Sequence, residues 1–92
     1  NGNNFLACIT TAQNALKDYP YTSMREEISI LLLRAKHKLG SESVLDKKEE
    51  RMRETIDEYY AIKNEFPESK YMKEVETIYK DASKYVKELN EE

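Results

Sequence analysis

The sequence predicts an all-α protein in which antiparallel helical hairpins stack as a short solenoid of about four helices. Glu, Lys and Leu are abundant, whereas the chain contains only two Gly and two Pro, and such a composition favours helices. Apolar residues recur at helical spacing through four segments, which gives each segment one face that can enter a core. A helix junction that occurs twice in similar form predicts that the hairpins repeat and stack.

Length and charge limit the kind of protein that the chain can be. Its 92 residues suffice for one compact unit, so residues 1–92 are expected to form a single fragment. Charged residues make up 36% of the chain, but seven Tyr and two Phe argue against disorder. The net charge of −3 gives no basis for nucleic-acid binding. The longest apolar run, "ILLL" at 30–33, is too short to span a bilayer.

The first helix is expected over residues 4–17. The preceding "NGNN" has the composition of a turn. Cys8, the only cysteine of the chain, is expected to be a small buried helix residue and has no partner for an intrachain disulfide. The residues that share the apolar face are Phe5, Ile9, Ala12 and Leu16.

The second helix is expected over residues 23–39. Thr22 is placed to act as its N-cap, and Gly40 occupies the position where a helix-ending glycine belongs. The apolar residues cover so much of the circumference that this helix is expected to pack on two neighbours. They are Met24, Ile28, Ile30, Leu31, Leu32, Leu33, Ala35 and Leu39.

The third helix is expected over residues 46–65. Asp46 and Glu49 have the spacing of a capping box, and the first two turns, "KKEERMRE", are almost entirely charged. Glu49 and Arg53 lie four residues apart, which favours a surface ion pair worth roughly 0.2–0.5 kcal/mol. The apolar face is formed by Met52, Ile56, Tyr59, Tyr60 and Ile62.

The fourth helix is expected over residues 70–88, after Pro67 and with Ser69 as its N-cap. It is the most regularly amphipathic segment of the chain. Its apolar face is formed by Tyr71, Val75, Ile78, Ala82, Tyr85 and Leu89.

One helix junction occurs twice, as "KDYPYTSMREEI" at residues 17–28 and as "NEFPESKYMKEV" at residues 64–75, with the two prolines 47 residues apart. Proline disfavours helical geometry in the residue before it, and a hydroxyl residue then caps the next helix. We expect the aromatic residue before each proline, Tyr19 or Phe66, to fill the gap between helices. The offset also pairs Ile9 with Ile56, Ala15 with Ile62, Met24 with Tyr71, Ile28 with Val75, Leu31 with Ile78, and Ala35 with Ala82.

A period of this size is typical of helical solenoids, whose units bury their apolar faces by stacking on their neighbours. A tetratricopeptide unit has about 34 residues, and the surplus here falls at residues 40–51. The predicted fold is therefore a stack of tetratricopeptide-like hairpins with a longer segment between the second and third helices.

The junctions and the segment between them resemble a known family. The order of "SVLDKKEER" before "TIDEYYAIKNEFPESKY" resembles the C-terminal part of BamD-type lipoproteins, in particular their Bacteroidetes-type members. The resemblance covers residues 5–86. It implies a periplasmic location at the outer membrane, within the complex that inserts β-barrel proteins.

In that family the C-terminal repeats contact the periplasmic domains of the BamA subunit, so the resemblance implies a non-enzymatic docking module. The lipid-anchor cysteine of the family lies far upstream, and Cys8 does not match it. The alternative is an unrelated tetratricopeptide-like adaptor, Tol–Pal-associated or cytosolic, that binds peptides or helices in its groove.

Catalytic, metal and cofactor sites are not predicted. His37 is the only histidine, with no second His or Cys at metal-ligand spacing, and we expect it to be a solvated residue on a helix surface. Neither a glycine-rich phosphate loop nor a nucleophile elbow is present. We expect no enzyme activity, no cofactor, no small-molecule substrate and no nucleic acid as partner.

Two kinds of residue are candidates for contact with a protein partner. Tyr21 and Tyr60 are aromatic residues that can anchor another chain if they are exposed, although partial burial at the repeat junctions is the simpler expectation. The charged start of the third helix can attract an acidic partner, although a solvated surface is the simpler reading. Its cations are Lys47, Lys48, Arg51 and Arg53. The remaining tyrosines at core spacing, whose hydroxyls should reach polar partners, are Tyr59, Tyr71, Tyr79 and Tyr85.

Overall fold

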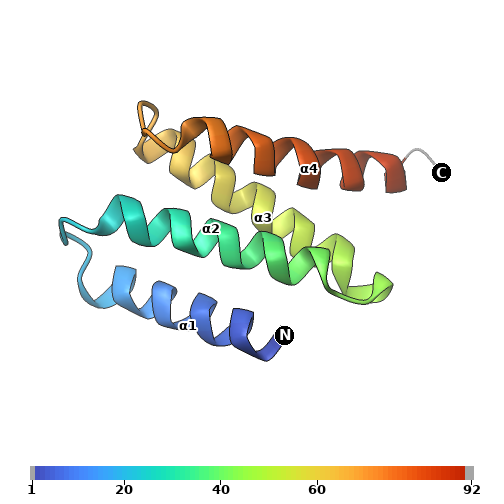
Figure 1. The fold of residues 1–92 in the computed structure, drawn as a ribbon, viewed down its shortest axis with the longest axis horizontal. Coiled ribbons are helices and arrows are strands. Elements are labelled where there is room, and N and C mark those ends of the chain that lie inside the picture. The colour runs from blue at the N-terminus through green and yellow to red at the C-terminus, as the bar shows by residue number, and fades with distance from the viewer. Residues whose placement is uncertain (1, 91–92) are drawn as a thin grey trace.

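The computed structural model describes residues 2–90 of the chain, with the side chains of residues 4–89. These residues form four α-helices and no strand (Figure 1), which confirms the all-α prediction. The helices are α1 (Gly2–Asp18), α2 (Arg25–Ser41), α3 (Leu45–Glu65) and α4 (Met72–Asn90). Each end lies within two residues of the end expected from the sequence.

Successive helices run antiparallel and pack against one another, and α2 also packs against α4 (Figure 1). Within the described residues, no Cα atom of α1 lies within 8 Å of α3 or α4. The four helices form a flat body with principal extents of 43 × 29 × 16 Å. The helix α2 is thus the one that joins α1 to the rest, as its wide apolar surface predicts.

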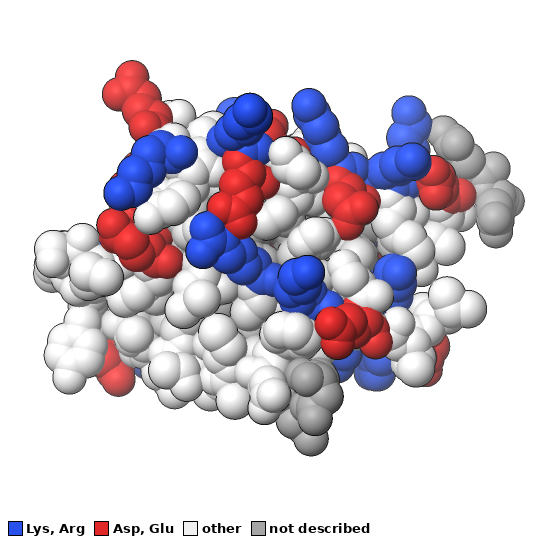
Figure 2. Space-filling model, viewed as in Figure 1, with Lys and Arg blue, Asp and Glu red and all other residues white. Residues whose placement is uncertain are grey.

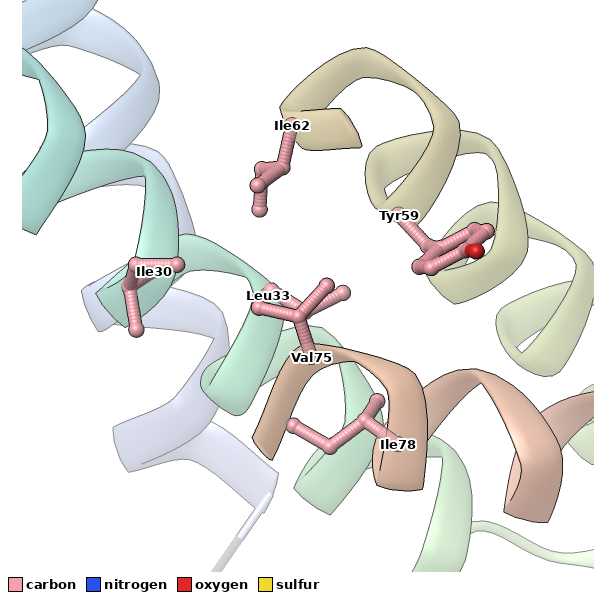
Figure 3. Close-up of a cluster of buried hydrophobic side chains, with 6 residues drawn as sticks. All are labelled: Ile30, Leu33, Tyr59, Ile62, Val75 and Ile78. Atoms are coloured by element: carbon pink, nitrogen blue, oxygen red, sulfur yellow. The ribbon is translucent and has the colours of Figure 1, made fainter. Parts of the chain in front are cut away.

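The main core lies where α2 meets the α3–α4 hairpin (Figure 3). Its six residues are Ile30 and Leu33 from α2, Tyr59 and Ile62 from α3, and Val75 and Ile78 from α4. A second cluster holds α3 to α4 through Met52, Ala82 and Val86. The two clusters bury the faces of α3 and α4 that the helical spacing of apolar residues predicts.

The two junctions share one hydrogen-bond pattern, in which five bonds donated by backbone N–H groups of the first recur 47 residues later in the second. The first junction has Tyr19 N–H to the Ala15 carbonyl (2.9 Å), Thr22 N–H to Tyr19 (3.1 Å), Arg25 N–H to Thr22 (3.2 Å), Ile28 N–H to Met24 (2.9 Å) and Met24 N–H to the Thr22 hydroxyl (3.2 Å). The second has Phe66 N–H to Ile62 (2.7 Å), Ser69 N–H to Phe66 (3.1 Å), Met72 N–H to Ser69 (3.1 Å), Val75 N–H to Tyr71 (3.0 Å) and Tyr71 N–H to the Ser69 hydroxyl (3.1 Å). The repeat seen in the sequence is therefore also a repeat of backbone geometry.

The predicted capping roles of Thr22 and Ser69 need correction. Each hydroxyl accepts a backbone N–H two residues on, but α2 begins only at Arg25, with Met24 at its N-cap position and no side-chain cap. The reason is an extra turn, closed in the first junction by the bond from Arg25 N–H to the Thr22 carbonyl. The hydroxyl residues stabilise this turn and not the first turn of the helix.

Gly40 and Asp46 also differ from prediction. Gly40 lies inside α2, which ends at Ser41, and it is buried with a negative φ. Its small size matters for packing, because a Cβ atom there would lie 3.2 Å from Met52 Sδ. Asp46 lies in the first turn of α3 and not at its cap, since Val44 occupies the N-cap with extended geometry and no side-chain cap bond.

Replacing Leu33 by Ala should reduce the free energy of unfolding by about 2–4 kcal/mol, because Leu33 is 0% exposed and its truncation leaves a cavity. Urea denaturation measures this change. The matched control is Leu31→Ala on the same helix, where the side chain is 47% exposed and the loss should stay below about 1 kcal/mol. Equal losses for the two variants would contradict the core described above.

Ser69→Ala should destabilise the protein by about 1 kcal/mol more than Thr22→Ala in the same denaturation assay. Both variants lose the turn bond to the residue two positions on. Only Ser69→Ala also loses the bond that the hydroxyl donates to Glu26 Oε2 on α2 (2.6 Å). If Thr22→Ala costs as much, the bond between the second junction and α2 contributes nothing.

Candidate interaction surface

Tyr21 projects into solvent at the outer corner of the first junction. Its side chain is 98% exposed, so the simpler expectation of partial burial was wrong for this residue. The bond from Thr22 N–H to the Tyr19 carbonyl (3.1 Å) closes a turn that places Pro20 and Tyr21 at its two central positions. Central residues of such a turn point outward, which leaves the ring available to a partner.

The junction pattern predicts that Tyr19 fills the gap between helices. In the structure it does not, and its side chain is 69% exposed. Its counterpart Phe66 is half-buried, because the first turn of α2 lies beside it and Glu26 and Glu27 line the same hollow. Among the described residues, no helix occupies the corresponding place beside Tyr19. The expectation therefore holds for one junction only.

Tyr60 belongs to a cluster of three aromatic rings at the α3–α4 contact and is 53% exposed. Its ring meets that of Tyr59 edge-on (centroids 5.0 Å apart), and its hydroxyl lies 3.3 Å from the Tyr79 hydroxyl. Tyr59 is buried, and burial raises the pKa of its hydroxyl. That hydroxyl donates to Glu76 Oε2 (2.9 Å). The core role predicted for Tyr59, with a polar partner for the phenol, is confirmed.

Three of the four predicted cations at the start of α3 already have partners within the chain. Lys48 Nζ lies 4.9 Å from the centroid of the Tyr85 ring, and Arg51 donates to the Ser43 hydroxyl (2.6 Å). Arg53 pairs with Glu49 (2.8 Å), which confirms that predicted pair. Lys47 is exposed. The start of α3 and the first junction lie at opposite ends of the molecule (Figure 1). The structure therefore does not bring these cations together with Tyr21.

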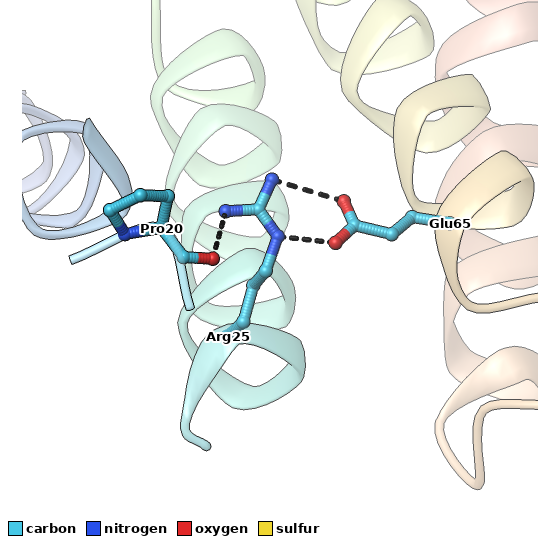
Figure 4. A network of polar contacts seen from close by, with 3 residues as sticks. All are labelled: Pro20, Arg25 and Glu65. Carbon is cyan, nitrogen blue, oxygen red and sulfur yellow. Dashed lines mark hydrogen bonds and ion pairs between the residues drawn. The ribbon is translucent and has the colours of Figure 1, made fainter. Parts of the chain in front are cut away.

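Arg25 joins the two junctions, a contact that the sequence did not reveal. Its guanidinium forms a bidentate pair with the Glu65 carboxylate at the end of α3, and its Nη1 donates to the Pro20 carbonyl (3.2 Å) (Figure 4). The hydrogen bonds that the Arg25 guanidinium donates to the Glu65 carboxylate raise the pKa of Arg25. One side chain thus ties the end of α3 to the turn before α2.

Further polar contacts hold α2 to its neighbours. Arg34 forms a bidentate pair with Glu74 of α4, with both distances 2.6 Å. His37 is not a solvated residue: its Nε2 lies 2.6 Å from Asp81 Oδ2, and its side chain is only 20% exposed. The one sequence signal for such contacts is the repeat of 47 residues. Arg34 and Glu74 are 40 residues apart, which is seven residues, or about two helical turns, less than one repeat.

A hollow between α1 and α2 has no charged residue in its lining. Figure 2 shows charged side chains over α2 and α4, whereas the surface over α1 is largely uncharged. The hollow has a volume of about 330 Å³, and Leu31, 47% exposed, borders it. Its lining residues are Ala7, Cys8, Thr11, Ala12, Ala15, Ile28 and Leu31. Cys8 is half-buried and lines this open hollow.

In residues 2–90 no cluster of three or more His, Cys, Asp and Glu residues is arranged to hold a metal ion. No described helix combines the length and apolar character that a membrane span requires. The surface features of this part of the chain are thus an exposed aromatic turn, cross-helix ion pairs and one apolar groove. Comparison with protein-family models and with curated protein sequences finds no match.

Glu74→Gln should lower stability at pH 7 by about 0.5 kcal/mol, since both partners of the pair are more than 40% exposed and solvent screens it. Hydrogen bonds from Arg34 lower the pKa of Glu74, so the stabilisation is present above the pKa of the unfolded chain and disappears as the pH falls through the folded-state pKa.

Urea denaturation at pH 7 and pH 3 tests this dependence, and the gap between Glu74→Gln and the parent chain should be smaller at the lower pH. The double variant Glu74→Gln with Arg34→Gln serves as the control. Because both changes remove the same interaction, the double variant should lose less stability at pH 7 than the sum of the losses of the two single variants. A gap that is the same at both pH values would contradict the assignment.

Proposed function

We propose that this chain is a non-enzymatic scaffold that binds other proteins, built from tetratricopeptide-like hairpins stacked as a short solenoid. The observation that carries the proposal is that the backbone N–H hydrogen bonds of one junction recur 47 residues later. Equivalent helices of successive units also meet, since α2 packs on α4. Repeats of this kind create extended surfaces that proteins use to bind one another.

We further propose that the chain is the C-terminal part of a BamD-type lipoprotein that docks to the periplasmic domains of BamA, at the periplasmic face of the outer membrane. The support is the sequence resemblance, which includes the segment between the second and third helices. In the structure most of that segment is helix, because α2 continues to Ser41 and α3 begins at Leu45. The extra residues therefore lengthen the hairpin and present Lys47 at its end.

A second candidate is a general adaptor, Tol–Pal-associated or cytosolic, that binds a peptide or a helix in a groove. The uncharged groove between α1 and α2 favours this candidate. The two proposals differ in partner and in surface, so one binding experiment with matched variants separates them.

The folded chain should retain the periplasmic domains of BamA in a pull-down, with circular dichroism confirming a helical fold of each variant. We expect the double variant Tyr21→Ala with Lys47→Glu to reduce binding at least about fivefold, because both side chains are exposed and aromatic anchors and charges contribute most to such contacts.

The matched control is Lys87→Glu, which changes an equally exposed cation at the end of α4. No retention of BamA domains by the folded parent chain would count against the BamD-type assignment. Retention that Lys87→Glu lowers as much as the double variant would place the contact elsewhere.

A further inference from the structure

One face of α2 makes its contacts with α4 and with the turn before α4. Glu26 accepts a hydrogen bond from the serine hydroxyl of that turn (2.6 Å), and His37 Nε2 lies 2.6 Å from a carboxylate oxygen of α4. Between them, Ile30 and Leu33 enter the main core. The four residues follow i, i+4, i+7 and i+11 spacing, so they form one row along the helix. In the first unit this row is the face on which the next unit stacks.

The equivalent row of α4 is cationic and faces solvent. Forty-seven residues after these four positions lie Lys73, Thr77, Lys80 and Lys84, and all four side chains are exposed. We call this row the lysine stripe. It extends about 16 Å along the helix, from the rise of 1.5 Å per residue. Figure 2 shows Lys and Arg side chains along the edge of the molecule that α4 forms.

The carboxylates of α4 do not neutralise the stripe. Two of the four, Glu74 and Asp81, bond with side chains of α2. Glu76 bonds with side chains of α3, and Glu88 lies beyond the end of the stripe. Within the part of the chain that the structure describes, no lysine of the stripe forms an ion pair. The contacts that hold α4 in the fold therefore use its anions and leave its cations outward.

A polar outer face is typical of the terminal unit of a solenoid, but that role alone does not require a single sign of charge. A mixed surface is equally soluble, and like charges four residues apart, such as Lys80 and Lys84, destabilise a helix. The stripe also excludes a further unit, from this chain or from a second copy, that packs as α2 does. Such a unit needs apolar residues where α4 has Thr77 and Lys80, and it would bury unpaired charge.

The stripe is narrow and has carboxylates on both sides. Glu76 lies on its α3 side with the side chain 33% exposed, and Asp81 lies on its α2 side with the side chain 59% exposed. A broad anionic surface such as a bilayer would bring its charge against these carboxylates as well as against the lysines. A narrow acidic segment contacts the lysines alone, so charge and shape together favour it.

We propose that the lysine stripe binds an acidic helix of a partner protein that lies along α4. A helix has the same rise per residue as α4, so carboxylates at its positions i, i+4, i+7 and i+11 form a row that matches the stripe. The surface is separate from Tyr21 and Lys47, which carry the BamA test. This inference rests on the proposed scaffold function and gives the chemistry of a partner for a further surface.

The probe is a fluorescent, alanine-rich peptide that a hydrocarbon staple holds helical, with Glu at positions i, i+4, i+7 and i+11. Its matched control has Gln at these four positions. Fluorescence anisotropy at low ionic strength should show saturable one-to-one binding of the Glu peptide to the full chain and none of the Gln peptide. Added salt should weaken the binding, because the pairs are exposed to solvent.

Lys80→Glu with Lys84→Glu in the chain should raise Kd at least about tenfold. Lys17→Glu with Lys38→Glu changes the net charge equally at exposed residues of α1 and α2, and Kd should change less than about twofold. A peptide with Lys in place of its four Glu should bind the Lys80→Glu, Lys84→Glu variant and not the parent chain. Circular dichroism checks the fold of each variant, and Lys80→Gln with Lys84→Gln replaces any that fails to fold.

Three results would overturn the proposal: no saturable binding by the folded parent chain, equal effects of the two double variants, or equal binding of the Glu and Gln peptides. Binding of phosphatidylglycerol vesicles or single-stranded DNA in place of the peptide would assign the stripe to that ligand instead. The outcome is separate from that of the BamA pull-down. A chain that retains BamA domains but not the peptide keeps the proposed function and loses this inference. The reverse result keeps the stripe and loses the BamD-type assignment.

Discussion

The insertion of one face of α2 into the groove of the α3–α4 hairpin is the contact on which the whole structure depends. Ile30 and Leu33 supply the apolar part, and neither is exposed by more than 1%. Among the described helices only α2 has Cα atoms within 8 Å of α1, so the place of the first helix in the fold depends on α2. A single helix that packs on both sides has to be apolar over most of its circumference, which explains the unusual run of aliphatic residues at its centre.

Polar contacts around this core determine the angle and register of the helices more than they add to stability. Arg25 connects the end of α3 to the turn before α2, and Ser69 connects the second turn to Glu26. Arg34 and Glu74 fix the alignment of α2 along α4. Exposed pairs of this kind contribute little individually, but a shift of α2 by one turn would break several of them together.

The comparison of the two repeat units explains which sequence-based expectations failed. The pattern predicted the same role for Tyr19 as for Phe66, yet the first is exposed and the second half-buried, because burial depends on a neighbouring helix that only the second unit has. His37 was expected in solvent, since its partner Asp81 lies 44 residues away and local pattern contains no sign of it. Thr22 and Gly40 were assigned helix-end roles that suit their residue types. In the structure Thr22 stabilises an extra turn before α2, and Gly40 makes room for the close approach of Met52. Tyr21 and the cations of α3 were named as candidates for contact with a partner. Only the structure shows that the first junction and the start of α3 lie at opposite ends of the molecule.

The sequence alone determined the four helices, their approximate ends, the repeat of 47 residues and the apolar faces, because these follow from local propensity and from periodicity along the chain. The tertiary structure decided which copy of a repeated face is covered. Ile78 and Leu31 occupy equivalent positions with equivalent chemistry, and one is buried while the other borders an open groove. Burial is a property of what lies opposite a residue in space, and the spacing of residues along one helix carries no information about whether a neighbour is there.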